Sequence, residues 1–321
     1  MTSLDGLSHH RRNIDVGALA PGLEGYRVAA DVFLPACSQV YSPAFCCLPG
    51  GGASRRYWDL RPPGDDGYSF AVHMARAGFP VICLDHLGTG ESALPRPAEP
   101  PLLGQVVAAN DAAFRLLLGE LRHTVAGLRS VGVGHSMGAV LTVRQQARHG
   151  THDAIALLGF SIKGLPSVLP PEILAACSEG IPGDVELAEL TLRKFGSAYP
   201  DLNRGGTDPA VPDPLRRALK EYATVLLGAG GMLSLLPGNV ASDAAEVRVP
   251  VLLANGDRDA LVGGGPPPTS PYSRATQITA FVVPEAGHNL TIAPARHRLW
   301  NRLLRWAKES AIRDDTEAES Q

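Results

Sequence analysis

Long apolar runs are absent from this chain. No uninterrupted apolar stretch in its 321 residues approaches the roughly 18 residues that a membrane-spanning helix needs. Residues 1–12 are polar and lack the apolar segment found at the centre of a secretory signal. We therefore expect no membrane span and a cytoplasmic location.

Large blocks of one charge are also missing. The formal net charge is −3, and the lysines and arginines are scattered along the chain, so we expect no nucleic-acid partner. Neither a Gly-x-Gly-x-x-Gly sequence nor a Walker A loop occurs, which removes the usual phosphate-binding signatures. We expect no cofactor and a small-molecule substrate as the partner. Nothing in the composition calls for an oligomer.

Cysteine is sparse and shows no pairing pattern. The chain has five cysteines, which are Cys37, Cys46, Cys47, Cys83 and Cys177. No Cys-x-x-Cys pair and no His/Cys cluster at zinc spacing is present. We expect neither a disulfide framework nor a metal site.

What the chain does contain is a motif for a sharply turned serine. Residues 134–138 read Gly-His-Ser-Met-Gly, follow the short run Ser130–Val133 and open the helical stretch Ala139–His149. A strand that turns into a helix through Gly-x-Ser-x-Gly lifts the serine hydroxyl clear of the sheet, and glycines are needed because no side chain fits so tight a bend. Ser136 is therefore the candidate nucleophile.

Strand patterns alternate with helical patterns on both sides of this motif. Short apolar or alternating runs predict strands at 26–34, 44–48, 80–84, 130–133, 154–160, 249–254 and 278–283. Helical spacing predicts helices at 68–77, 102–125, 139–149 and from Pro294 onward. This order implies right-handed crossovers and an α/β fold with a largely parallel sheet, with 26–34 at its antiparallel start.

The same alternation divides the chain. We expect residues 1–25 to form a loosely held N-terminal arm, and residues 26–161 together with 246–310 to form the α/β core. Residues 162–245 contain helix-like pieces separated by Pro- and Gly-rich turns, which predicts an inserted helical cap. Residues 311–321 are expected to be an acidic tail.

A glycine-rich loop follows the predicted strand at 44–48. It reads Pro-Gly-Gly-Gly-Ala-Ser over residues 49–54, and its backbone N–H groups would face the space above the sheet, as an oxyanion hole requires. We choose Gly51 as one donor, with Gly52 as the alternative, and the N–H of Met137 as the second donor.

The candidate base and acid follow later strands. A serine needs a base within hydrogen-bond reach, and that base needs a carboxylate to orient it. His288 follows the last predicted strand, and a parallel sheet delivers such loops to the edge that carries Ser136. The strand at 249–254 leads into Asp257 and Asp259, and either residue is the candidate acid.

In chain order these motifs resemble the α/β-hydrolase superfamily. The likeness rests on the glycine loop at 50–52, Asp85-x-x-Gly88-x-Gly90-x-Ser92, Gly134-x-Ser136-x-Gly138, Gly256-x-x-Asp259 and Gly287-His288. The resemblance implies a mostly parallel sheet flanked by helices with an inserted cap, and the triad order serine, acid, histidine. It favours Asp259 as the acid, with Asp257 pinning the turn. Pro49 departs from the family pattern, because relatives commonly have a histidine there.

These observations predict a carboxylesterase-like serine hydrolase. Ser136 would form an acyl-enzyme with an ester, lactone or thioester of a moderately apolar small molecule, and water activated by His288 would release the acid. The expected substrate pocket includes Gly52, His86, Met232 and Leu233. A structural role is the alternative for His86, and packing of the cap onto the core is the alternative for Met232 and Leu233.

Other functions remain open for the same residues. The triad can also cleave an activated C–C bond or pass the acyl group to an alcohol, and the scaffold can serve as a non-catalytic ligand-binding module. Only an acyltransferase would make more ester when an acceptor alcohol is added. The intact serine, acid and histidine argue against a binding module.

Overall fold

One mixed sheet organises the part of the chain that the computed structural model describes, residues 6–36, 43–62, 65–95, 101–195, 213–221 and 228–311. Its eight strands are β1 (Ser8–Asp15), β2 (Arg27–Leu34), β3 (Ala44–Leu48), β4 (Val81–Leu84), β5 (Ser130–His135), β6 (Ala154–Leu158), β7 (Val251–Gly256) and β8 (Ile278–Val283). In space they follow the order β1-β2-β4-β3-β5-β6-β7-β8.

The sheet is parallel from β4 to β8 and antiparallel at its other end. All pairs are parallel along the series β4-β3-β5-β6-β7-β8. The two remaining pairs, β1 with β2 and β2 with β4, are antiparallel. This confirms the predicted mostly parallel sheet. Because parallel strands end at the same edge, the loops after β3, β5, β7 and β8 come together there.

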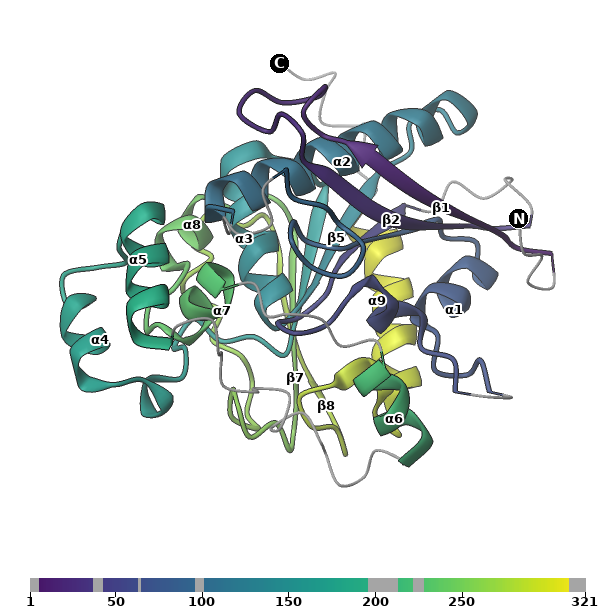
Figure 1. Cartoon of the computed structure of the whole chain (residues 1–321). Coiled ribbons are helices and arrows are strands. Elements are labelled where there is room, and N and C mark those ends of the chain that lie inside the picture. Colours follow the sequence, from purple (N-terminus) through teal and green to yellow (C-terminus); the bar gives the residue numbers. More distant parts are fainter. Residues whose placement is uncertain are drawn as a thin grey trace, which may run out of the picture.

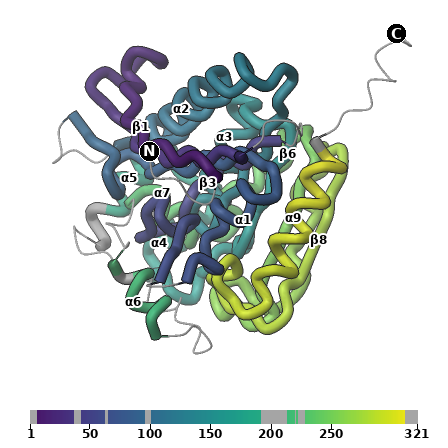
Figure 2. The backbone as a smooth tube through the Cα atoms, turned by 90° about the vertical axis from the view of Figure 1, so that its right-hand side faces the viewer, coloured from purple at the N-terminus to yellow at the C-terminus, as the bar shows by residue number. Residues whose placement is uncertain are grey.

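Helices cover both faces of the sheet (Figure 1). In chain order they are α1 (Phe70–Arg76), α2 (Leu103–Thr124), α3 (Met137–His149), α4 (Pro171–Ala176), α5 (Asp184–Phe195), α6 (Asp213–Glu221), α7 (Gly228–Leu235), α8 (Ala241–Glu246) and α9 (Arg296–Ala311). Short 3₁₀ turns are η1 (Arg55–Asp59), η2 (Pro166–Val168) and η4 (Leu290–Ile292). One apolar core joins α2, α3, α7 and α8 to the sheet, and a second joins α1 and α9 to its opposite face. Figure 2 shows α9 running beside β8 at the edge of the molecule.

The sequence of β5 explains how closely α3 approaches the sheet. Val131 and Val133 point into the core shared with α1 and α9. The alternate residues are glycines, and a Cβ on Gly134 would lie 2.5 Å from the Cα of Ala139 in α3. Since side chains alternate between the two faces of a strand, Gly134 leaves room for α3 on this face, and Gly132 leaves room for the His152 side chain, 2.4 Å from where its Cβ would lie.

The N-terminal region differs from our expectation. Residues 1–25 are not only a loose arm, because Ser8–Asp15 forms edge strand β1 and pairs with β2 along its whole length. The strand is polar apart from buried Ile14, so it carries no alternating apolar signal. An edge strand needs none, since it is held by backbone pairing and faces water. The Arg12 guanidinium also donates two hydrogen bonds to the Glu120 carboxylate on α2, at 2.6 and 2.8 Å.

Residues 162–245 connect β6 to β7, and their described part contains η2 and helices α4 to α8. Asp184, the first residue of α5, ties this connection to the core. Its carboxylate accepts a 2.6 Å hydrogen bond from the N–H of Gly104 and a 3.2 Å hydrogen bond from Arg144. Residues 196–212 and 222–227 of the predicted cap lie outside the described residues, as does the acidic tail beyond Ala311.

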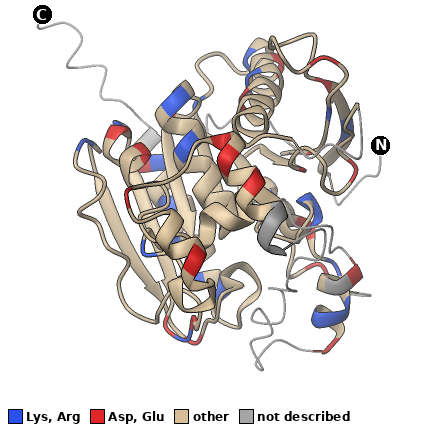
Figure 3. Ribbon diagram, turned by 60° about the vertical axis from the view of Figure 1, so that its left-hand side comes forward, with Lys and Arg blue, Asp and Glu red and all other residues tan. Residues whose placement is uncertain are grey.

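Charged residues of both signs are interspersed over the described surface (Figure 3). No helix within the described ranges combines the length and the hydropathy that crossing a membrane would require. Cys46, Cys47, Cys83 and Cys177 are buried free thiols, and Cys37 falls outside the described ranges.

Candidate active site

Ser136 lies where β5 ends and α3 begins. Its backbone has φ 54° and ψ −120°, a conformation that residues with a side chain rarely adopt and that costs about 1–3 kcal/mol. The Ser136 N–H donates to the carbonyl of Leu158 at 2.8 Å, and its carbonyl accepts from the N–H of Ala139 at 2.9 Å. These bonds to β6 and α3 hold the sharp turn that the motif predicts.

The two motif glycines allow the chain to pack tightly around this turn. A Cβ on Gly138 would lie 2.3 Å from the carbonyl oxygen of Leu48 at the end of β3, and one on Gly134 would overlap the backbone of α3. Contacts this short would force the backbone apart. Glycine is therefore required at both positions, as expected from the sequence.

His288 lies between Ser136 and an aspartate. Its Nε2 is 2.9 Å from the Ser136 Oγ, and its Nδ1 is 2.9 Å from the Oδ2 of Asp259. A carboxylate only accepts hydrogen bonds, so Nδ1 carries the hydrogen, and Nε2 of the neutral ring is free to accept from the serine hydroxyl. The structure thus brings together Ser136, His288 and Asp259, which come from loops 152 and 29 residues apart.

Asp259 is buried and held by backbone groups. Its Oδ1 accepts hydrogen bonds from the N–H groups of Leu261 at 2.9 Å and Val262 at 3.2 Å. Burial alone would raise the pKa of this carboxyl group. The hydrogen bond from His288 and the two backbone N–H groups outweigh burial and hold the pKa below its usual value. The carboxylate therefore remains charged beside the imidazole.

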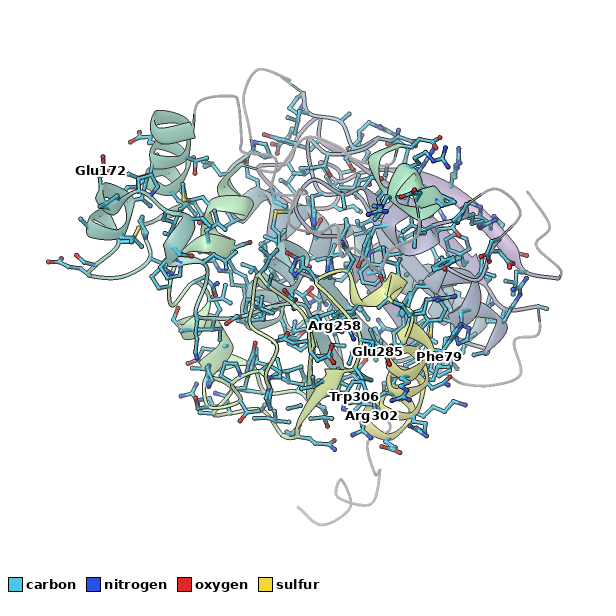
Figure 4. All side chains as sticks on the ribbon, turned by 90° about the horizontal axis from the view of Figure 1, so that it is seen from below. Phe79, Glu172, Arg258, Glu285, Arg302 and Trp306 are labelled. Atoms are coloured by element: carbon cyan, nitrogen blue, oxygen red, sulfur yellow. The ribbon has the colours of Figure 1, made fainter. Side chains whose placement is uncertain are left out.

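Asp257, the alternative acid, does not contact His288 but pins the loop that precedes it. Its Oδ1 accepts the N–H of Ala286 at 3.1 Å, and the backbone N–H of Arg258 donates to the Ala286 carbonyl at 2.9 Å. Hydrogen bonds from the backbone N–H groups of Glu285 and Ala286 lower the pKa of Asp257. Figure 4 shows Arg258 and Glu285 next to each other on the two loops that are joined in this way.

The glycine loop after β3 passes directly beside the serine. A Cβ on Gly50 would lie 3.2 Å from the Cβ of Ser136, which is a tight contact, so glycine lets the loop pass this close to the serine. Gly51 follows at once, and Gly52 adopts a left-handed conformation with φ 73°. Met137 is the first residue of α3, and the N–H of a first helical residue has no acceptor within its own helix.

His86 has a different position from the pocket lining that we expected. Its side chain is 0% exposed, its Nε2 is 3.0 Å from the carbonyl oxygen of Pro49, and its Nδ1 is 3.2 Å from the amide nitrogen of Asn110. Both ring nitrogens are thus engaged inside the protein. His86 supports the start of the glycine loop and does not line a pocket, which is the structural alternative stated for it.

Met232 and Leu233 also differ from the expectation. They are 1% and 0% exposed and belong to the apolar core that includes α3. A pocket wall would retain surface that solvent can reach, and these side chains have almost none. They attach α7 to the core, which is the packing alternative.

A buried ionic cluster is centred on Arg55, the residue that follows the glycine loop, and was missed in the sequence. Arg55, 2% exposed, donates to Asp85 at 2.5 Å, to Asp31 at 2.7 Å and to Glu91 at 2.7 Å. Burial alone would lower the pKa of the guanidinium, but these carboxylates raise it above its usual value. Asp85 also accepts the backbone N–H groups of Arg55 and Glu91. We call these four residues the Arg55 cluster.

A sequence signal for part of the Arg55 cluster did exist. Asp85 begins the Asp-x-x-Gly-x-Gly-x-Ser turn, and a Cβ on Gly90 of that turn would overlap the Asp85 carboxylate. Asp31 interrupts the apolar strand β2, where a lone carboxylate needs a cationic partner if it is buried. Nothing in the local sequence marks Arg55 as that partner.

No group of three or more His, Cys, Asp or Glu side chains in the described part of the chain is arranged to hold a metal ion. The arrangement around Ser136 brings a hydroxyl, an imidazole and a carboxylate into hydrogen-bonding contact. These are the groups that acyl transfer requires.

A family model described as the alpha/beta hydrolase family matches residues 47–297. A search of curated protein sequences gave no match. The matched range contains all the motifs from the glycine loop to His288.

Solved structures of similar fold include several hydrolases at low identity. An esterase from Exiguobacterium antarcticum is 14% identical with a TM-score of 0.61, covering 88% of this chain and 96% of that one. The enol-lactonase from Burkholderia xenovorans LB400 is 18% identical with a TM-score of 0.54, covering 88% of this chain and 97% of that one. A thioesterase domain from the curacin biosynthetic pathway is 14% identical with a TM-score of 0.55, covering 92% of this chain and 99% of that one. At such identities these likenesses establish the fold alone.

Proposed function

The chain belongs to the alpha/beta hydrolase family, and we propose that it is a serine hydrolase that cleaves a carboxylic ester-like bond of a small molecule through an acyl-enzyme on Ser136. The observation that carries the proposal is the hydrogen-bonded series from the Ser136 hydroxyl through His288 to Asp259, with both distances at 2.9 Å. A strained turn, a buried carboxylate and close-packed glycines all serve this contact.

In the first half of the reaction Ser136 Oγ attacks the substrate carbonyl carbon. His288 Nε2 takes the hydroxyl proton, and Asp259 stabilises the resulting imidazolium. The tetrahedral intermediate collapses when the bond from carbon to the leaving oxygen or sulfur breaks. His288 gives its proton to that leaving atom, which leaves an acyl-enzyme on Ser136.

In the second half water replaces the leaving group. His288 takes a proton from water as the water oxygen attacks the acyl carbon, and it returns that proton to Ser136 Oγ as the ester bond breaks. The products are the carboxylic acid and the free enzyme. No redox change occurs, and every proton transfer passes through His288.

The negative oxygen of each intermediate needs hydrogen-bond donors. We assign this role to the backbone N–H groups of Gly51 and Met137, because Gly50 brings the loop against Ser136 and Met137 begins α3. Gly52, two residues beyond Gly50, is the alternative donor and pocket residue. Loss of one such donor costs typically about 10²–10³ in kcat.

Residues 162–245 form the proposed cap that selects the substrate. Their insertion between β6 and β7 and the attachment of α5 through Asp184 support this role. The names of the similar structures, an esterase, an enol-lactonase and a thioesterase domain, support an ester, lactone or thioester as the substrate class. The burial of Met232 and Leu233 gives no support to an apolar pocket wall, so acyl-chain preference must be measured.

The first test compares wild type with Ser136→Ala on p-nitrophenyl esters of increasing chain length, one lactone and one thioester. We expect hydrolysis by wild type and a loss of at least about 10⁴-fold in the variant. Ser310→Ala is the matched control, since Ser310 lies at the C-terminal end of α9, outside both the proposed cap and the candidate triad, and should leave the rates unchanged.

A serine-directed fluorophosphonate tests the nucleophile without assuming a substrate. Wild type and Ser310→Ala should be labelled, and Ser136→Ala should not. A wild type that hydrolyses none of the substrates and resists the label would overturn the proposal. Additional ester formed on adding an alcohol would assign the same acyl-enzyme to an acyltransferase instead.

A further inference from the structure

His135, the residue before the serine, is buried between parts of the candidate active site. Its Nε2 is 2.9 Å from the main-chain carbonyl oxygen of His288. A carbonyl only accepts hydrogen bonds, so this nitrogen carries the hydrogen, and Nδ1 of the neutral ring has none. The motif required only that some residue precede Ser136, and the proposed mechanism does not use this imidazole.

The His135 ring is closely packed where it makes that bond. The Tyr57 ring stacks on it at a centroid distance of 4.7 Å and an angle of 15°. A Cβ on Gly50 would lie 3.0 Å from its Nδ1, and one on Gly159 would lie 3.3 Å from its Nε2. Glycines on two loops thus make room for the imidazole, one beside each of its nitrogens.

The hydrogen bond from His135 holds the backbone of His288, the residue whose side chain is the proposed base. The His288 carbonyl accepts from His135 and also from the N–H of Leu290 at 3.0 Å, which begins η4. Two donors from different directions fix this peptide group. The His288 side chain, 2.9 Å from both Ser136 and Asp259, starts from that fixed point.

We propose that His135 is a positioning residue, whose Nε2–H holds the His288 carbonyl and thereby sets the reach of the His288 imidazole between Ser136 and Asp259. The effect on turnover rests on the proposed function, whereas the tautomer and the bond do not. A change of about 1 Å in the position of a reacting group costs on the order of 10²-fold in rate, so a bond of this kind has a measurable effect.

The surroundings keep His135 uncharged while His288 changes its charge. Burial first, and the nearby His288 second, lower the pKa of His135 from 6.5 to about 3, although the His288 carbonyl and Asp259 act in the opposite direction. The two imidazole centroids are 5.0 Å apart. The other titratable group stacked against the ring is Tyr57, whose pKa burial raises. A proton on His288 therefore meets no second positive charge on His135.

The kinetic test compares His135→Leu with His135→Gln. Leucine fills a similar volume without a donor, whereas the glutamine amide nitrogen reaches about as far as the imidazole Nε2. We expect kcat to fall about 10- to 100-fold in His135→Leu with KM changed less than about twofold. His135→Gln should recover most of kcat, and His123→Leu, an exposed site on α2, should match wild type.

A kcat for His135→Leu equal to wild type would overturn the proposal, and so would a His135→Gln that is as slow as a folded His135→Leu. Urea unfolding of each variant shows whether it is folded when it is assayed. If wild type itself neither turns over an ester nor reacts with the fluorophosphonate, the proposed function fails, and the tautomer is then decided by spectroscopy.

The spectroscopic test uses ¹⁵N-histidine-labelled wild type and needs no activity or variant stability. We expect the His135 ring to remain a neutral Nε2–H tautomer from pH 8 down to about pH 4, because the folded protein disfavours its charged form, and the buried rings of His86 and His152 add further neutral signals. Its signal is assigned by its absence from the His135→Gln spectrum. A His135 ring found as the Nδ1–H tautomer, or protonated at pH 6, would overturn the proposal.

Discussion

Two buried aspartates in this molecule are held in nearly the same way, yet they serve different ends. Asp85 accepts two backbone N–H groups and one nitrogen of the Arg55 side chain. Asp259 also accepts two backbone N–H groups and one side-chain nitrogen, from His288. Each carboxylate follows a strand of the sheet, and each is almost fully buried.

The partner makes the difference between them. Arginine stays charged at every accessible pH, so the pair of Arg55 and Asp85 can hold a loop but cannot move a proton. Imidazole gains and loses a proton near neutral pH, so the same carboxylate arrangement beside His288 can support general base chemistry. The Arg55 cluster should therefore control stability, and the Asp259 contact should control rate.

The largest effect should come from removing the charge at Asp259. An asparagine amide at this position can donate to His288 and so favour the wrong tautomer, and we expect Asp259→Asn to lower kcat/KM by about 10⁴-fold. Asp257→Asn is the matched control and should stay within a few-fold of wild type. Steady-state kinetics on one active ester decides this, and a larger loss in Asp257→Asn would show that Asp259 is not the acid.

The second prediction concerns Asp85 and its partner Arg55, and it is measured as a change in stability. Arg55→Met leaves Asp85 and Asp31 buried without the Arg55 cation, so we expect the free energy of unfolding to fall by about 3–5 kcal/mol. Arg56 contacts Glu91 with a side chain that is 37% exposed, and Arg56→Met should cost less than about 1 kcal/mol. Urea titrations of both variants provide the comparison. Equal losses would mean that burial of Arg55 is not what matters.

The third prediction uses pH, because a buried imidazole changes its charge between about pH 3 and 7 whereas a guanidinium does not. Burial lowers the pKa of His152 from 6.5 to about 3, so the unfolded chain binds a proton in this interval that the folded chain does not. Stability must therefore decrease as pH falls from about 6.5 to about 3, by about 1.4 kcal/mol per pH unit for each such histidine. His152→Gln should show a shallower slope in urea titrations at several pH values, and an unchanged slope would contradict the assignment.

The smallest effect comes from a paired arginine on the surface. Arg12 contacts Glu120 through two hydrogen bonds, but the two side chains are 39% and 43% exposed. We expect Arg12→Gln to lower the free energy of unfolding by only about 0.2–1 kcal/mol, since water screens the pair. A loss as large as that of Arg55→Met would show that β1 depends on this contact rather than on its backbone pairing.

The meeting of Ser136 and His288 with an aspartate that follows β7 could be predicted, because backbone rules bring these loops to one edge of the sheet. A Gly-x-Ser-x-Gly sequence between strand and helix specifies a tight turn, and parallel strands bring the loops after β5, β7 and β8 to one edge. Choosing between Asp257 and Asp259 needed the family resemblance. Both residues follow the same strand, and only the turn geometry sends one carboxylate inward.

Side chains whose roles depend on distant partners could not be predicted. His86 occupies a loop at the expected edge, but Pro49 and Asn110 take both of its nitrogens. An apolar residue such as Met232 can line a pocket or pack a helix onto the core. The packing of α7 against α3 decides which of these roles it has. β1 is held by backbone pairing with β2 and not by apolar side chains, so it can be polar. Hydrophobic periodicity therefore could not reveal it.

The position of β8 has a consequence for how the molecule loses activity. β8 is the last strand of the sheet, pairs with β7 alone among the described strands, and leads into the loop that carries His288. Edge elements open locally with less free energy than the centre of a fold. On heating or in mild urea, hydrolysis should therefore disappear before the circular dichroism of the sheet does, so that enzyme assays detect fraying that bulk spectroscopy misses.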